Sequence, residues 1–435
     1  MNPLFLLFCG VLVVAQLALP RRLAFLPLLI VVCHLPNDPV IEAGVTFTPT
    51  KLIVLTGLLR AASEHRLRFS IRNPLDAVVS WWAAWVIFTG FFHHPVDSNP
   101  ITIRLSLAYD VWACYIYARS FIANTDDFLR FCRCLILVLL PLGGLMVVEK
   151  ATGQNPYSVI GGKETEIRDG RMRAAGPFGH AILAGTFGAA CVPLVLLGGR
   201  KKRLWPASGL AACMAVAVCS NSSGPLMTLS SGLMGLCLWP LRRSVRTIRL
   251  LAVFGVIALN FVMNAPVWYL IARIDLTGSS TSYYRAELIT QAINHFNEWW
   301  LIGTDYTRHW MASGSVWSDT QADLTNYYIK MGVTGGLALL ILFVAIFATA
   351  FRRLGRAIPR LRSVRDSNEF TLWCVGTTLM AYCITFISVT FFDQSWALFC
   401  ILLGSVPGLT VPVQRAQPLA DHSLATEHAF ELPNA

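Results

Sequence analysis

Residues 131–148 read FCRCLILVLLPLGGLMVV, an apolar run that contains a single charged residue, Arg133. A helix of this length crosses most of the roughly 30 Å of hydrocarbon in a bilayer. Similar runs recur along the chain, and we expect spans at 4–19, 23–35, 46–61, 75–93, 103–121, 131–148, 181–198, 205–220, 224–240, 249–270, 326–350, 369–391 and 395–412. The sequence therefore predicts an all-α, polytopic transmembrane helical bundle of about 12–13 spans.

The composition of the chain supports this fold class. Of the 435 residues, 55% are hydrophobic and 14% are charged, whereas about 25% are charged in an average soluble domain. So few charges exclude a soluble enzyme and, despite a net charge of +11, a nucleic-acid partner. The 12 cysteines lie in or beside the apolar runs, which excludes a disulfide scaffold and gives no metal-ligand spacing. We therefore expect no metal site and no cofactor.

The basic residues predict the topology of the bundle, because cytoplasmic loops are enriched in Lys and Arg. Basic clusters follow alternate spans: Arg21–Arg22, Arg60–Arg72, Arg119–Arg133, Arg200–Arg203, Arg242–Arg249 and Arg352–Arg365. With these clusters inside, the two long loops, 149–180 and 271–325, are extracytoplasmic. We treat 1–412 as one integral-membrane domain and expect 413–435 to be a disordered cytoplasmic tail. Long loops between spans are where function is expected.

The first long loop carries Arg168, Arg171 and Arg173, against the charge bias of an outer loop. Arg173 lies shortly before the next span and precedes a Gly-Pro-Phe-Gly turn. A guanidinium fork in that place suits a phosphate oxygen near the headgroup plane. The alternative is a solvated loop in which the arginines pair with Glu164, Glu166 and Asp169.

The second long loop is rich in aromatic residues and contains a predicted amphipathic helix over 281–300, outside the bilayer. Aromatic faces pack on sugar rings but also form interfacial belts, and the belt is the favoured interpretation for Trp299 and Trp300. The apolar stripe of the helix is expected to comprise Arg285, Leu288, Ile289, Ala292 and Phe296. An arginine on such a stripe is costly unless it faces a partner, which singles out Arg285.

The end of this loop places carboxylates, an amide and phenols at the membrane face, where a lipid-linked headgroup would lie. The residues are Asp319, Asp323, Asn326, Tyr327 and Tyr328. The alternative is a polar helix start with Asp323 or Thr325 as the N-cap.

The order of these motifs resembles the O-antigen ligase/polymerase superfamily, bacterial integral-membrane glycosyltransferases that use lipid-linked sugars. The resemblance covers roughly 140–345 and rests on short motifs in sequence: E-x₂-T-G-x-N-P (Glu149–Pro156), R-x-x-G-P-F-G-H (Arg173–His180), a Ser-rich turn (Ser220–Gly224), R-x₁₇-G (Arg285–Gly303) and T-N-Y-Y-x₃-G-x₂-G-G (Thr325–Gly336).

The resemblance implies that Arg173 and Arg285 hold an undecaprenyl diphosphate and that Asn326 matches the family asparagine. Thr325 stands where ligases of this superfamily usually carry histidine, and Ser222-Ser223-Gly224 lacks the arginine often found in that turn. These departures favour the polymerase branch. The expected site comprises catalytic Arg173, Arg285, Asp323 and Asn326, and substrate-binding Arg171, His180, Tyr284 and Tyr327.

The expected function is a metal-independent polymerase of exopolysaccharide or O-antigen in the bacterial cytoplasmic membrane. Its partners would be an undecaprenyl-diphosphate-linked glycan, membrane lipid and a chain-length regulator of the same pathway. Candidate bases for the acceptor hydroxyl are Asp319, Asp323 and His309, with His180 less favoured because it enters a span.

Two other functions stay open. One is a ligase that attaches the finished glycan to lipid A core or protein. The other is a flippase in which the intramembrane Asp110 supports proton coupling, unless Asp110 is only a structural partner of a hydroxyl or an arginine.

Overall fold

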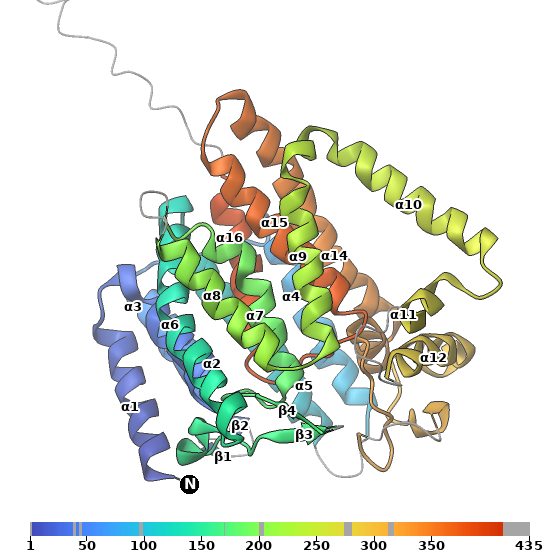
Figure 1. The fold of residues 1–435 in the computed structure, drawn as a ribbon, viewed down its shortest axis with the longest axis horizontal. Helices are drawn as coiled ribbons and strands as arrows, with labels where there is room; N and C mark the ends of the chain where they lie inside the picture. Colours follow the sequence, from blue (N-terminus) through green and yellow to red (C-terminus); the bar gives the residue numbers. More distant parts are fainter. Residues whose placement is uncertain are drawn as a thin grey trace, which may run out of the picture.

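The structure, a computed structural model, describes residues 2–37, 41–42, 46–94, 99–168, 170–199, 204–273, 281–311 and 317–411. Over these residues the protein is all-α, with 16 α-helices and two short β-hairpins (Figure 1). The helices are α1 (Pro3–Ala18), α2 (Phe25–His34), α3 (Pro49–Ser63), α4 (Pro74–Thr89), α5 (Pro100–Phe121), α6 (Thr125–Thr152), α7 (Ala181–Val195), α8 (Leu204–Cys219), α9 (Ser223–Cys237), α10 (Val245–Val262), α11 (Leu270–Arg273), α12 (Thr281–Asn294), α13 (Phe296–Trp299), α14 (Tyr327–Ser363), α15 (Asn368–Thr385) and α16 (Trp396–Leu409). The hairpins pair β1 (Ile41–Glu42) with β2 (Thr46–Phe47), and β3 (Glu166–Arg168) with β4 (Arg171–Arg173).

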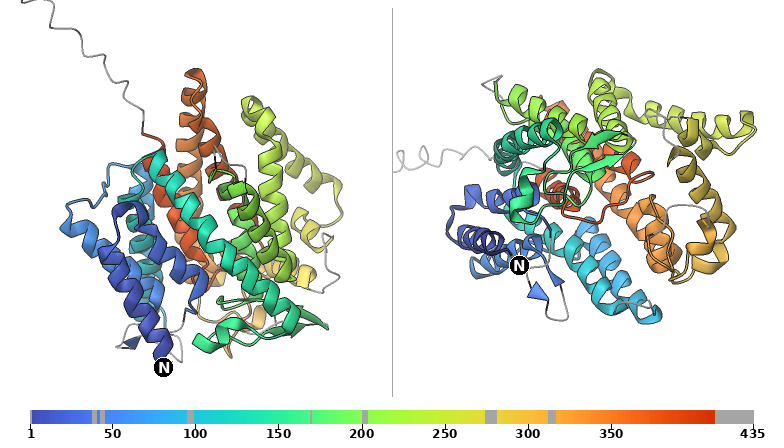
Figure 2. Two further views of the ribbon diagram at one scale, coloured as in Figure 1. Left: turned by 60° about the vertical axis from the view of Figure 1, so that its left-hand side comes forward. Right: turned by 60° about the horizontal axis from the view of Figure 1, so that its bottom comes forward.

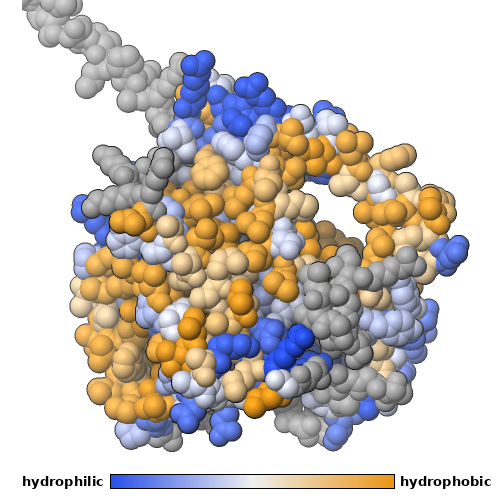
Figure 3. Space-filling model, in the orientation of Figure 1, coloured by the Kyte–Doolittle hydropathy of each residue, from blue (hydrophilic) through white to orange (hydrophobic). Residues whose placement is uncertain are grey.

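Four helical segments in the described part of the chain are long and apolar enough to cross a membrane, which indicates a multi-pass membrane protein. They are Pro74–Phe92, Thr125–Thr152, Trp239–Val262 and Tyr327–Ser363. Helices α1, α7, α8 and α16 are also apolar but shorter. Figure 3 shows a broad apolar band across the molecule, with hydrophilic residues gathered above it. Helix α10 has no buried residue and stands away from the other helices, so its apolar side chains suit contact with lipid.

The basic end of α14 and the two long loops lie toward opposite ends of the bundle. The turn between α14 and α15, which follows the basic stretch of α14, lies at one end of the bundle, and hairpin β3–β4 of the first long loop lies at the other (Figures 1 and 2). Elements of the second long loop, such as α12, lie toward the same end as the hairpin. The two long loops are therefore placed to act together.

Every predicted span contains a helix, but several helix ends differ from the prediction. Helix α10 stops at Val262 rather than near 270, because Pro266 disfavours helical backbone in the residue before it. Helix α15 stops at Thr385 instead of 391, and the following segment 386–395 bonds to the two long loops instead of continuing the helix. Helix α14 continues beyond 350 to Ser363, through the basic stretch.

Several helices begin at an Asn-Pro pair, which sets their N-termini. Asn2, Asn73 and Asn99 each accept a hydrogen bond from the backbone N–H two residues further on, and proline follows each of them. The asparagine satisfies an N–H that has no partner within the helix, and proline at the first helical position has no N–H to satisfy.

Small residues allow the central helices to pack closely. Helix α5 packs along α16, α6 along α8, and α7 against both α8 and α9. A methyl group on Gly404 of α16 would lie 2.5 Å from the carbonyl oxygen of Tyr115, and one on Gly408 would lie 2.6 Å from that of Ile122. Glycines four residues apart on one helix face therefore let the two backbones approach, as is common between membrane helices.

Helix α14 is bent at Gly335 and Gly336, where the backbone leaves the helical conformation. The backbone N–H of Leu337 donates to the carbonyl of Trp300 at 2.7 Å, and the carbonyl of Val333 accepts from Thr304 N–H at 2.9 Å. Gly336 has φ +73°, and a methyl group there would lie 2.3 Å from the carbonyl oxygen of Leu301. The second long loop therefore makes hydrogen bonds with α14 on both sides of the bend. Groups that insert into the hydrogen-bond ladder of a helix are a recognised cause of a kink.

The second long loop forms a small core of its own. Leu288, Ala292 and Trp299 pack there with other apolar side chains of the loop and of α14. The predicted helix over 281–300 is wrong in part, because α12 ends at Asn294 and Phe296 is 42% exposed. The belt interpretation of Trp299 is also wrong, because its indole is buried and donates to the carbonyl of Ala292 at 2.8 Å.

Candidate functional site

The first motif of the first long loop forms a buried scaffold. Glu149, fully buried at the end of α6, accepts hydrogen bonds from the hydroxyl of Thr165 at 3.1 Å and from the backbone N–H groups of Ala175 at 3.0 Å and Gly176 at 2.8 Å. The side-chain amide of Asn155 donates to the carbonyl of Gly176 at 2.8 Å. These bonds turn the chain after β4 back toward the start of α7.

Segment 386–395 connects both long loops. The carboxylate of Asp393 accepts from the backbone N–H of Gly179 in the first loop at 2.9 Å. The carbonyl of Phe386 accepts from the backbone N–H of Tyr327, at the end of the second loop, at 2.8 Å. Burial raises the pKa of Asp393, although its bonds to Ser395 and Gly179 oppose that shift. Most of this segment falls within the spans predicted from the sequence, so this connecting role was not predicted.

His180 is the N-cap of α7. Its Nδ1 accepts from the backbone N–H of Ile182 at 3.1 Å, so the proton of the neutral ring is on Nε2. That Nε2 lies 3.5 Å from the carboxylate of Glu166, and Glu166 also pairs with Arg173 at 2.9 Å across hairpin β3–β4. Burial lowers the pKa of His180; the charge of Glu166 opposes the shift and the charge of Arg173 adds to it.

A cavity of about 190 Å³ lies where the two long loops meet the start of α14. Its lining includes His180 from the first loop, Arg285, Asp323 and Thr325 from the second, and Lys330 from α14. The structure therefore brings together three predicted site residues, His180, Arg285 and Asp323, that are far apart in the sequence. The hydroxyl of Thr325 is buried and has no hydrogen-bond partner among the described residues.

A larger cavity of about 510 Å³ shares part of this wall and extends into the helices. Lys330 lines both cavities, and Tyr327, Arg104 and Asp110 line the larger one. Asp110 lies 3.8 Å from the ammonium group of Lys51. Its partner is thus a lysine, not the hydroxyl or arginine considered from the sequence.

Burial and nearby charges shift the pKa of the Asp323 carboxylate in opposite directions. Burial raises its pKa, while the charges of Lys330 and Arg285 lower it. Tyr284 donates its hydroxyl to the backbone carbonyl of Asp323 at 2.9 Å and so holds this stretch of the loop. Burial raises the pKa of Tyr284 to about 12, and the charge of Asp323 contributes. Tyr284 therefore stays protonated as a donor.

One predicted catalytic residue, Asn326, has a structural role at the start of α14. Asn326 is the N-cap of α14, and its side-chain oxygen accepts from the backbone N–H groups of Tyr328 at 2.9 Å and Ile329 at 3.1 Å. The prediction that Asp323 or Thr325 caps this helix is therefore wrong. The side-chain oxygen that the resemblance would assign to chemistry is engaged in ordering the helix start.

The arginines of the first loop lie outside the linings of both cavities. Arg171 is exposed on β4. Arg173 is 6% exposed and paired with Glu166, one of the partners considered from the sequence. The Nε of Arg173 is buried with no hydrogen-bond partner among the described residues. Arg173 contacts the site through Glu166, which lies beside His180.

The candidate bases differ in their position relative to the two cavities. Asp323 lines the smaller cavity, whereas Asp319 is exposed and His309 binds Glu298, and neither lines either cavity. Lys330 and Arg104 were not among the site residues predicted from the sequence. Both are cations within predicted spans, a signal that marks functional positions in membrane helices.

The site combines cations, a carboxylate and a histidine in a partly enclosed space between two loops. Arg285 and Lys330 can bind a phosphate group, and Asp323 can accept a proton beside it. Comparison with protein-family models found no match, and comparison with curated proteins found none either.

Proposed function

We propose that the chain is a membrane polymerase that transfers a glycan from undecaprenyl diphosphate to a lipid-linked repeat unit in exopolysaccharide or O-antigen synthesis. The main support is the cavity at the junction of the two long loops, where Arg285, Lys330 and Asp323 line one space. The motif order seen in the sequence gives independent support. The position beside apolar helices suits a substrate whose lipid stays in the bilayer.

The proposed reaction is a substitution at the anomeric carbon of the donor sugar. The acceptor hydroxyl forms the new C–O bond, the bond between that carbon and the diphosphate oxygen breaks, and the hydroxyl proton passes to Asp323. Arg285 and Lys330 stabilise the negative charge that grows on the diphosphate. Because burial raises the pKa of Asp323, it is a stronger base than an ordinary carboxylate.

Arg173 has a supporting role in this proposal. Its ion pair with Glu166 orients the carboxylate that lies beside the Nε2 of His180. The Nε of Arg173 is buried and Arg173 lines neither cavity, so this residue supports the site through Glu166 and makes no direct contact with the diphosphate. Lysine at this position retains the charge but loses the planar fork that orients the carboxylate of Glu166.

The proposal includes a topology of about 12–13 spans with both long loops outside the cytoplasmic membrane. Ser158 in the first loop and Ser63 at the end of α3 are both exposed. In a background without the exposed Cys237, Ser158→Cys should react with an impermeant maleimide in whole cells and Ser63→Cys only after lysis. The reverse pattern would overturn the topology.

A transporter of lipid-linked oligosaccharide is the second candidate, because the larger cavity leads to the intramembrane pair of Asp110 and Lys51. The glycan profile of a deletion strain distinguishes the functions. Loss of polymer with single repeats retained supports a polymerase. Free polymer that is not attached indicates a ligase, and cytoplasmic accumulation of lipid-linked units indicates a transporter.

A further inference from the structure

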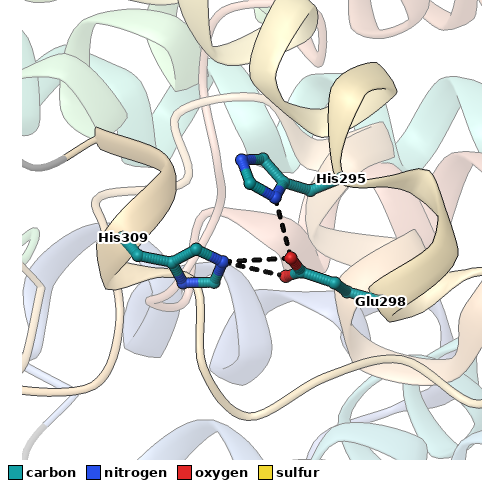
Figure 4. Close-up of side chains that lie close together, drawn as sticks. All are labelled: His295, Glu298 and His309. Atoms are coloured by element: carbon teal, nitrogen blue, oxygen red, sulfur yellow. Dashed lines mark hydrogen bonds and ion pairs between the residues drawn. The ribbon is translucent and has the colours of Figure 1, made fainter.

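A second cluster of polar side chains lies in the second long loop, outside both cavities. His295 and Glu298 are one helical turn apart where α12 passes into α13, and His309 comes from the short 3₁₀ helix Arg308–Met311 (Figure 4). The Nδ1 of His295 lies 2.7 Å from the carboxylate of Glu298. The Nε2 of His309 lies 3.1 Å and 3.0 Å from the two oxygens of that carboxylate.

Neighbouring aromatic side chains hold the two imidazole rings in place. His295 stacks on Trp310 with an interplanar angle of 10° and a centroid distance of 5.6 Å. His309 stacks on Tyr306 at 12° and 4.9 Å. Trp310 also donates its indole N–H to Glu298 at 2.9 Å. Both rings and the carboxylate are therefore oriented before any ligand arrives.

We propose that His295, Glu298 and His309 bind one zinc ion, with water in the fourth position. Two imidazole nitrogens and one carboxylate oxygen form a donor set that zinc prefers and that calcium and magnesium, which favour oxygen, do not. This proposal stands independently of the proposed polymerase function.

The spacing of the donor atoms fits such an ion. One ligand atom from each of the three residues lies within 4.8 Å of the other two. A tetrahedral zinc with bonds of about 2.0–2.2 Å separates its ligands by roughly 3.3–3.6 Å. Small side-chain movements reach that geometry, and the side chains are 29–34% exposed, so water and metal can enter.

The carboxylate of Glu298 is placed to act as a metal ligand, because it already faces the indole N–H of Trp310 and a ring nitrogen of both His295 and His309. Metal binding also requires neutral imidazoles, so it releases any proton that they carry.

Zinc bound at this site would stabilise one wall of the smaller cavity. The backbone N–H groups of Thr307 and Arg308 both donate to the carbonyl of Thr320 at 3.0 Å. The hydroxyl of Thr307 accepts from the backbone N–H of Ala322 at 3.1 Å. These hydrogen bonds connect the 3₁₀ helix that carries His309 to Thr320 and Ala322, which shortly precede Asp323 in the sequence.

The direct test is the metal content of the purified full-length protein in detergent. After zinc loading and desalting, mass spectrometry of the metal should find about one zinc per chain, and zinc should raise the melting temperature. The double variant His295→Ala/His309→Ala should lose both effects. The control His65→Asn, which changes an exposed histidine with φ +52° elsewhere in the chain, should keep both.

A second measurement serves if the double variant does not fold. Cobalt in the wild-type site should give the visible d–d bands of tetrahedral Co²⁺. Trp310→Phe keeps the stacking ring but removes the bond to Glu298, and should weaken zinc binding about 10–100-fold. Absence of bound zinc and of tetrahedral cobalt bands in the wild type, or equal loss in His65→Asn, would overturn the zinc site.

Discussion

Replacing Asp323 by asparagine should separate catalysis from folding at the proposed site. Asparagine has nearly the same shape but cannot accept the proton of the acceptor hydroxyl. The bond from Tyr284 is made to the backbone carbonyl of Asp323 and is therefore kept. Asp323 is also the acidic side chain among the described residues that line the smaller cavity. A positioned general base contributes about 10²–10⁴ in rate, which is the loss that we expect for Asp323→Asn.

The folding stability of Asp323→Asn, unlike its reaction rate, should not fall. Because burial raises the folded pKa of Asp323, its contribution to folding is greatest below the unfolded value of about 3.9 and is lost as the pH rises through the folded value. Asparagine removes a charge that is costly at neutral pH, so the melting temperature should be equal or higher. In the wild type, activity should rise as the pH rises through the raised pKa.

The assay is the polymerisation rate of purified protein in proteoliposomes, with the melting temperature measured in detergent. The matched control is Asp319→Asn in the same loop, where the carboxylate is exposed and lines neither cavity. A wild-type rate for Asp323→Asn would refute the assignment of the base. So would an equal loss for Asp319→Asn.

Four further predictions test the other parts of the site, the first three by polymer yield normalised to inserted protein. Arg285→Lys should lose about 10²–10³ in rate, the usual effect of removing one contact to a growing negative charge. Arg173→Lys should also be severely impaired, because lysine cannot hold the Glu166 carboxylate as the guanidinium does, while Arg168→Ala should be mild; the opposite order would contradict the supporting role of Arg173. Thr325→Ala should retain substantial polymer, because a hydroxyl alone is too weak a base to be essential, and complete loss would reopen the choice of base. Glu149→Ala leaves three donors without their acceptor, each worth about 1–3 kcal/mol when buried, so the purified variant should melt at clearly lower temperature; unchanged melting would contradict the scaffold role.

The helices could be predicted from the sequence because apolar runs of membrane length have few other structures available. The ends of some helices could not be predicted, because hydrogen bonds to other parts of the fold replace helical hydrogen bonds there. The stretch 386–395 reads partly as a span, yet Asp393 bonds to Gly179 of the first loop. The break at Gly335–Gly336 depends on bonds with the second loop, which no local pattern reveals.

The candidate site was predicted in part. The motif order singled out Arg285, the polar residues at the end of the second loop included Asp323, and the structure brings both to one cavity with His180. The roles of Asn326 and Arg173 could not be separated from structural ones by sequence, since capping and ion pairing need the same side chains. The importance of Lys330 depends on the cavities that it lines, which only the fold reveals.

The most direct test of the central claim is reconstitution of the purified chain with lipid-linked repeat units. Proteoliposomes that contain undecaprenyl-diphosphate-linked units should produce a ladder of longer glycans and release one undecaprenyl diphosphate for each new linkage. The Arg285→Lys protein should form both products about 10²–10³ times more slowly. Movement of the intact lipid-linked unit across the bilayer, with no release of undecaprenyl diphosphate, would contradict the polymerase and identify a transporter.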